Sequence, residues 1–309
     1  MIDSKPSRRV VVLFGAGASF GAGGILPEAP PLGQNLYEAL SRLYPGTWGL
    51  LPAEIQAAFH ADFETGMQLV YEKLGVAISQ LMRDMAIYFV QFRSANGNSL
   101  YDRLITTASG DGYLHSLAFA TLNYECVLEF ALAKNATGVD YFGAGDSTHV
   151  PVWKLHGSCN MFSHQVQATE GVLYTPGVVF EGGIEATLDT SLVVERCLTS
   201  ALAPVMSLYM AGKPLAVSPT SIKAVQQIWA SAVAGAQAVI CIGLRPNPPD
   251  EHIWNPLAAT SAPVYFVGDT AGFSAWAAEC RSGPSVSLGG RLGDSFHRII
   301  DTAREHASQ

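Results

Sequence analysis

Short apolar runs that recur along the chain constrain its fold more than any other feature of the sequence. The runs occupy residues 10–14, 117–121, 150–155, 214–217, 238–242 and 264–267, and the stretches between them are long enough for helices. A strand buried on both faces has a continuous apolar sequence, and alternation of such strands with helices is typical of a covered parallel sheet. The pattern predicts an α/β fold with a Rossmann-like parallel sheet and helices on both faces.

Apolar spacings of three and four residues predict amphipathic helices. One wide apolar stripe runs from residue 67 to residue 92 and indicates a single long helix. A second runs from residue 222 to residue 233, after a Ser/Thr/Pro start signal at 218–221. Further helices are expected from about Gln34 and over 192–210. We expect both stripes to face the core.

The length and composition bound the domain organisation. With 309 residues, of which 49% are hydrophobic and 14% charged, the chain has ample material for a deep core. We expect a single domain over 1–309, whose Rossmann-like core comprises about 8–45, 113–159 and 213–306. The region 46–112 is predicted to be a helical insertion without strands that caps the site, and 160–212 an irregular and partly helical segment. The last residues, 304–309, are expected to fray.

Several classes of protein are disfavoured by composition. Lys5, Arg8 and Arg9 precede the first apolar run as in a secretion signal, but that run is too short for one. The apolar stretch 230–244 is too short and too mixed to cross a bilayer. The net charge of −8 argues against binding nucleic acid through a phosphate-neutralising surface. The five cysteines include no Cys-x-x-Cys pair, so we expect reduced thiols, no zinc, no other metal, and a cytoplasmic location.

The first apolar run leads into a glycine-rich loop, "GAGASFGAGG", at residues 15–24. The dinucleotide fingerprint of dehydrogenases requires Gly-x-Gly-x-x-Gly, and Phe20 stands where the third glycine belongs. Gly15, Ala16 and Gly17 still allow main-chain amides to approach a pyrophosphate, and Ser19 adds a hydroxyl donor. A strand-to-helix turn that binds nothing remains the alternative.

Polar residues follow two later runs, where open parallel sheets place their ligand chemistry. Asn123 lies just beyond 117–121, and its position is equally compatible with capping the next helix and with catalysis. His156 follows 150–155 and can act as a base near neutral pH.

The last two runs end in residues that suit the adenosine half of a nucleotide. Gly243 is followed by Arg245 and, after three prolines, by Asp250, while Asp269 ends "PVYFVGD" and could accept hydrogen bonds from a ribose diol. A surface ion pair for Arg245 and a turn cap for Asp250 are the structural alternatives.

In this order, "GAGAS", "TLNYE", "KLHGS" and "VICIGL" followed by an aspartate resemble the sirtuin family, and more closely its bacterial sirtuin-like branch of anti-phage NAD hydrolases. The resemblance covers about 10–269. It implies that Gly15, Ala16, Gly17 and Ser19 form the NAD-binding loop, that Asn123 lies beside the nicotinamide ribose and His156 is the catalytic histidine. It also assigns Gly243 to the adenosine side, where we add Arg245 and Asp269.

The chain departs from the deacylating sirtuins at several places. Glu125 stands for their aspartate, "ILPEAPPLG" for their Gly-Ile-Pro-Asp-Phe-Arg, Leu244-Arg245 for the serine after the glycine, and the zinc-binding Cys pairs of their small domain are absent. The resemblance therefore implies an NAD glycohydrolase that takes NAD as its substrate, releases ADP-ribose and nicotinamide, and acts in abortive infection. The alternatives are a non-catalytic module that binds NAD or ADP-ribose and, less favoured, an NAD-dependent protein deacylase. The implied partners are further copies of the chain, or a separate activating subunit such as a ring ATPase or an Argonaute-like protein.

Overall fold

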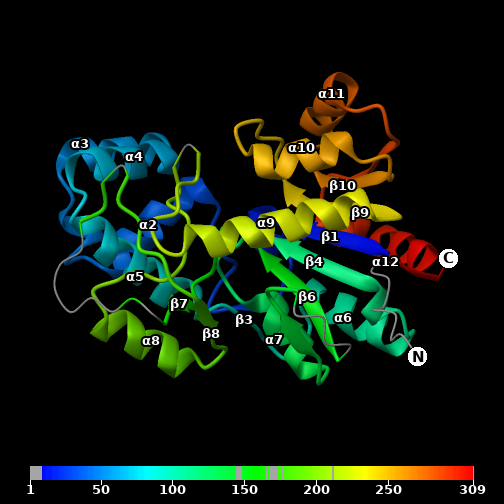
Figure 1. Ribbon diagram of the computed structural model, residues 1–309, viewed down its shortest axis with the longest axis horizontal. Helices are drawn as coiled ribbons and strands as arrows, with labels where there is room; N and C mark the ends of the chain where they lie inside the picture. Colours follow the sequence, from blue (N-terminus) through cyan, green and yellow to red (C-terminus); the bar gives the residue numbers. More distant parts are fainter. Residues whose placement is uncertain are drawn as a thin grey trace.

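The computed structural model describes residues 9–143, 148–164, 166, 173–175, 177–210 and 212–308. Lys5, Arg8, Gln309 and parts of 160–212 lie outside these residues. The described chain forms one half built on a sheet and a second half built from helices, which lie side by side in Figure 1.

The sheet has seven strands, all parallel, in the order β11-β10-β9-β1-β4-β6-β5. They are β1 (Val10–Phe14), β4 (Leu117–Thr121), β5 (Gly138–Asp140), β6 (His149–Lys154), β9 (Ala238–Leu244), β10 (Val264–Gly268) and β11 (Ser285–Gly289). β1 is central, and all five of its residues are buried because it is covered on both faces and both edges. The predicted Rossmann-like parallel sheet is confirmed.

Helices cover both faces of the sheet, as predicted. The core on one face joins β1, β4 and β9 to α9 (Pro219–Ala234), α10 (Glu251–Ala259) and α11 (Thr270–Cys280). The larger core on the other face reaches α6 (Leu100–Gly110), α7 (Val127–Lys134) and α12 (Leu292–Ser308). Figure 1 shows α9 crossing over the strands.

The remaining helices form the second half of the molecule. They are α2 (Gly33–Leu43), α3 (Ala53–Ala61), α4 (Phe63–Lys73), α5 (Ala77–Phe89) and α8 (Thr190–Thr199). The short turn η1 (Trp48–Leu50) joins α2 to α3, and a second short turn, η2 (Leu114–Ser116), precedes β4. The rings of Tyr37, Trp48, Phe59 and Phe63 pack against one another and hold α2, α3 and α4 together. Two small antiparallel pairs complete the fold: β2 (Ile25–Leu26) with β3 (Arg93–Ser94), and β7 (Met161–Ser163) with β8 (Ile184–Ala186). The presence of β3 means that 46–112 is not free of strands.

Two strand predictions need correction. The run 214–217 is not a strand, because Lys213 and Ser218 adopt left-handed backbone conformations, φ 42° and 50°, that turn the chain at both ends. The short edge strands β5 and β11 were not predicted. The first three residues of β11, Ser285, Val286 and Ser287, are exposed. The strand therefore lacks the continuous apolar run that is typical of a buried strand.

Three helix predictions also need correction. The helix predicted over 67–92 is two helices, since the chain breaks at Gly75, whose carbonyl accepts a hydrogen bond from the Tyr174 amide and whose missing Cβ leaves room for the Tyr174 carbonyl. The helix predicted over 192–210 ends at Thr199, because 205–207 instead makes backbone hydrogen bonds to 156–161. The tail does not fray before Ser308, since Ala303 and Ala307 are buried.

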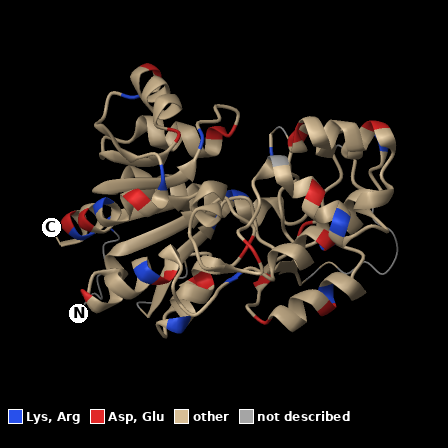
Figure 2. Cartoon of the chain, turned by 180° about the vertical axis from the view of Figure 1, so that it is seen from behind, with Lys and Arg blue, Asp and Glu red and all other residues tan. Residues whose placement is uncertain are grey.

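Two further features of the fold are the distribution of its charged residues and the length of its helices. Figure 2 shows acidic and basic residues intermingled over both halves of the molecule. Within the described ranges, none of the helices combines the length and apolarity that a bilayer-crossing segment needs.

Candidate functional site

The carboxyl ends of β1, β4 and β6 meet at one edge of the sheet because these strands are parallel neighbours. Phe14 at the end of β1 pairs with Thr121 of β4, which pairs with Lys154 of β6. Asn123 and His156 follow at equal distances after Thr121 and Lys154. The fold therefore brings the predicted amide and imidazole to the same edge.

Asn123 is joined to the glycine-rich loop through its side chain. Its Nδ2 donates hydrogen bonds to the carbonyl oxygen of Gly15, at 3.1 Å, and to Ser19 Oγ, at 3.0 Å. It does not cap the next helix, because α7 begins at Val127 and Cys126 occupies the N-cap position. The amide thus links the end of β4 to the loop that follows β1.

Ser19 is the centre of a buried polar cluster. Its hydroxyl donates to Glu125 Oε1 and lies 2.8 Å from the Tyr101 hydroxyl of α6. Glu125 Oε2 accepts a hydrogen bond from the Val127 amide at 2.8 Å, so one carboxylate ties the loop to the start of α7. Burial and, next, the Glu125 carboxylate raise the pKa of Tyr101 well above its ordinary value, which keeps this hydroxyl protonated.

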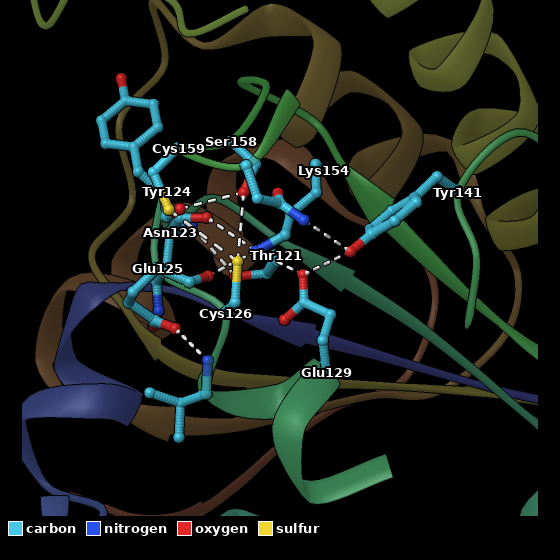
Figure 3. A network of polar contacts seen from close by, with 12 residues as sticks. Thr121, Asn123, Tyr124, Glu125, Cys126, Glu129, Tyr141, Lys154, Ser158 and Cys159 are labelled. Carbon is cyan, nitrogen blue, oxygen red and sulfur yellow. Dashed lines mark hydrogen bonds and ion pairs between the residues drawn. The ribbon is translucent and has the colours of Figure 1, made fainter. Parts of the chain in front are cut away.

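The turn that carries Asn123 rests on a buried lysine, shown in Figure 3. Lys154 Nζ donates to the carbonyl oxygens of Glu125, at 2.5 Å, and Asn123, at 3.4 Å, and lies 2.8 Å from Glu129 Oε1. Burial, the largest single cause, acts to lower the pKa of Lys154, but Glu129, Cys126 and Glu125 together outweigh it and the net shift is upward. Lys154 therefore remains charged and holds the backbone of the turn.

A second set of contacts fixes the same turn from the loop after β6. The Tyr124 carbonyl accepts hydrogen bonds from Ser158 Oγ and from the Cys159 amide, both at 3.0 Å. The Cys126 and Cys159 sulfurs lie 3.9 Å apart as free thiols (Figure 3). The two strand ends therefore form one rigid unit.

The loop glycines have a packing reason of their own. Gly243 has φ 69°, and a Cβ there would lie 2.0 Å from the Ala18 nitrogen. A Cβ on Gly15 would lie 2.7 Å from the Gly243 carbonyl oxygen, and one on Gly17 would lie 2.9 Å from it. The glycines let α1 (Ala16–Phe20) pack on the end of β9, so their presence does not by itself distinguish a phosphate cradle from a plain turn.

His156 is buried and faces a second histidine. Its Nε2 lies 2.9 Å from Nε2 of His252, in the first turn of α10. Burial and, next, His252 lower the pKa of His156 well below its ordinary value, so the ring is neutral near pH 7. A neutral imidazole can accept a proton.

A small cavity lies beside Asn123 and the loop. Its volume is about 60 Å³, and it is walled by Ala16, Ser19, Pro30, Pro31, Gly33, Leu36, Phe89, Leu122, Asn123, Tyr124, Glu125 and Tyr209. Small-molecule sites usually enclose roughly 300–1,000 Å³, so the cavity must enlarge before it can hold a dinucleotide. His156 is not part of its wall as the structure describes it.

The remaining predicted residues lie apart from this cavity. Arg245 is exposed and its Nε lies 4.0 Å from Asp269 Oδ2. Asp269 Oδ1 accepts a hydrogen bond from the Gly272 amide at 3.0 Å and so caps α11. Asp250 accepts one from the Asn247 side chain at 3.1 Å.

Four residues of the site escaped the sequence analysis. Lys154 interrupts the otherwise apolar run 150–155, which is a signal that could have been used, and His252 follows Asp250 by two residues, in the first turn of α10. Tyr101 and Tyr209 come from segments distant in sequence, and no local pattern points to them. Only the tertiary fold brings them to the loop.

Fold and site together define a Rossmann-like α/β protein with an asparagine-and-serine cluster at the carboxyl edge of its sheet. No protein-family model and no curated protein matches the chain. Among solved structures it is similar to one described as "Structural Basis for the Mechanism and Regulation of Sir2 Enzymes", with 14% identity and a TM-score of 0.45 over 98% of this chain and 95% of that one. In the described residues, no group of three or more His, Cys, Asp or Glu side chains is placed to hold a metal ion.

Proposed function

We propose that the protein is a sirtuin-like NAD+ glycohydrolase that cleaves the bond between nicotinamide and ribose. The observation that carries the proposal is the Asn123 amide, which reaches from the end of β4 to Gly15 and Ser19 of the loop after β1. The four ordered sequence motifs support it, because they predict a role for these same residues in binding and cleaving NAD+.

The reaction consumes water and releases ADP-ribose, nicotinamide and a proton. Nicotinamide leaves as a neutral group, so positive charge builds on the ribose, and the site must fix the sugar and offer water to one face. In the proposal the first-turn amides of Ala16 and Gly17 bind the pyrophosphate. Asn123 orients the ribose or the water, and the neutral His156 accepts the proton of the attacking water.

Binding of NAD+ requires the cavity wall to open. Pro30, Pro31 and Gly33 form one wall, and the preceding residues 26–29 are exposed. We propose that 26–33 moves outward to admit the nicotinamide ribose, while Gly243, Arg245 and Asp269 flank the adenosine side. NAD+ should then change the amide hydrogen exchange of 26–33.

Nicotinamide release from NAD+ tests the proposed activity. Asn123→Ala and His156→Ala should each reduce turnover by at least about a hundredfold. Asn98→Ala is the matched control, since Asn98 is exposed and outside the cavity wall. Wild-type turnover in both site variants, with circular dichroism showing intact folds, would refute the proposal.

We further propose that the activity serves bacterial anti-phage defence by depleting NAD+ in abortive infection. This part of the proposal rests on the resemblance in the sequence motifs. The chain would act as a homo-oligomer or beside a separate activating subunit, such as a ring ATPase or an Argonaute-like protein. Co-purification with the neighbouring gene product, followed by the NAD+ assay, tests for such a subunit.

A non-catalytic module that binds NAD or ADP-ribose is the second candidate. The small volume of the cavity and the engagement of both Asn123 and His156 by protein groups favour it. Thermal stabilisation by NAD+ without nicotinamide release, in the presence and in the absence of the co-purified partner, would select this alternative.

A further inference from the structure

His252 contacts the residue that the proposed reaction uses as its base. It lies in the first turn of α10, and its ring is 5.1 Å from that of His156 between centroids. The two Nε2 atoms are 2.9 Å apart, which is hydrogen-bond distance.

The backbones that carry the two rings are both held in place. The Trp229 indole of α9 donates a hydrogen bond to the His252 carbonyl at 3.2 Å, and Trp229 is fully buried. The His156 carbonyl accepts a hydrogen bond from the Ser207 amide at 2.8 Å. The following Gly157 has φ 74°, and a Cβ there would lie 2.0 Å from the Val205 carbonyl oxygen. The contact between the rings is therefore fixed by the fold.

A hydrogen bond between two imidazole nitrogens contains one proton, so one Nε2 donates and the other accepts. If His252 were the donor, His156 would be protonated on Nδ1 and its Nε2 lone pair would be occupied, leaving no atom to accept a proton. If His156 is the donor, its Nδ1 keeps a free lone pair. Whether His252 Nε2 accepts or donates this hydrogen bond thus decides which nitrogen of His156 is basic.

We propose that His252 is a positioning residue that fixes His156 with the proton on Nε2 and leaves Nδ1 as the atom that accepts a proton. This inference rests on the proposed function, because it assigns the basic atom of the proposed catalytic histidine. His252 itself need not touch the substrate.

Nuclear magnetic resonance of the full chain with ¹⁵N-labelled histidine tests the assignment without any activity. His156→Gln and His252→Gln assign the two rings. We expect His156 to show a protonated Nε2 and an unprotonated Nδ1, and His252 to show an unprotonated Nε2. A His156 ring protonated on Nδ1, or one whose signals in His252→Phe match those of the wild type, overturns the inference.

Steady-state kinetics of nicotinamide release provide the second arm. His252→Phe retains a ring but removes the acceptor, so kcat should fall by at least about tenfold while KM changes less than about threefold. His252→Gln keeps an acceptor oxygen and should recover part of kcat. His297→Phe, at an exposed position of α12, is the control for loss of a histidine. An unchanged kcat in His252→Phe overturns the inference.

The two arms separate this inference from the proposed function. If the wild-type protein releases no nicotinamide with or without its partner, the proposed function fails and the resonance experiment alone decides whether His252 fixes the tautomer of His156. If the wild-type protein is active and His156→Ala is inactive, while His252→Phe behaves as wild type, only the inference fails.

Discussion

Lys154 Nζ lies 2.8 Å from Oε1 of Glu129, and neither side chain is more than 1% exposed. The same ammonium group holds the carbonyls of Asn123 and Glu125, so a buried charge supports the turn on which the proposed site depends. Removing one charge of such a pair leaves the other buried without compensation, which costs more than the pair itself contributes.

We expect Lys154→Met to lower the free energy of unfolding by about 3–5 kcal/mol. The double variant Lys154→Met/Glu129→Leu should recover much of this loss, because no buried charge remains. Lys73→Met is the control: Lys73 Nζ lies 2.8 Å from Glu54 Oε2, but the two side chains are 45% and 61% exposed, so its loss should cost at most about 1 kcal/mol. Urea unfolding measures all three, and equal losses in the two single variants would contradict the argument.

The contact between α1 and β9 can be tested with two glycines of equal φ. Gly243 and Gly97 both have φ 69°, but a Cβ on Gly243 would meet the Ala18 nitrogen whereas one on Gly97 would have no heavy atom within 4 Å. Gly97→Ala should cost about 1 kcal/mol from backbone strain alone, and Gly243→Ala about 2–4 kcal/mol. Similar melting temperatures for the two variants would show that the close approach is unimportant.

The sheet could be predicted from the sequence because its central strands are buried on both faces. All residues of β1 and β4 are buried, so each appears as an unbroken apolar run. The edge strand β11 has no such run, and the break at Gly75 between α4 and α5 is set by a backbone contact with Tyr174. Gly75 and Tyr174 are distant in sequence, so a local sequence pattern does not reveal contacts of this kind.

The site could be predicted only where a residue directly follows a strand. Asn123 and His156 could be predicted to lie at one edge of the sheet because parallel strands bring their carboxyl ends together. Tyr101 reaches Ser19 from a helix 82 positions away, and His252 reaches His156 across 96 positions. Such partners depend on how the helices pack, which periodicity does not specify.

Ser19→Ala should disturb the buried polar cluster more than Tyr101→Phe. Ser19 Oγ contacts Glu125, Asn123 and Tyr101, so its removal leaves three groups short of a partner, and we expect a loss of about 1–3 kcal/mol. Tyr101→Phe removes a single hydroxyl and should cost about 1 kcal/mol. Chemical denaturation measures both, and a larger effect of Tyr101→Phe would place the centre of the cluster elsewhere.

The histidine pair should make the fold sensitive to acid. Burial, as the largest cause, lowers the pKa of both His156 and His252, so the unfolded chain binds protons more readily than the folded chain. The free energy of unfolding should therefore fall as the pH drops below about 6.5, the ordinary histidine pKa. The double variant His156→Gln/His252→Gln should lose less stability than the wild type between about pH 7.5 and pH 5. An equal loss in both proteins would contradict this assignment.

Asp269 allows its capping role to be separated from its proposed contact with the ribose. Its Oδ1 accepts the Gly272 amide at the start of α11, so Asp269→Ala should cost about 1 kcal/mol. Asparagine caps helices equally well, so Asp269→Asn should retain stability while it removes the carboxylate charge. If the carboxylate binds the ribose diol, KM for NAD+ should rise about three- to tenfold in both variants. A KM that stays at the wild-type value in Asp269→Asn would leave Asp269 as a helix cap alone and move the adenosine side of the site away from the end of β10.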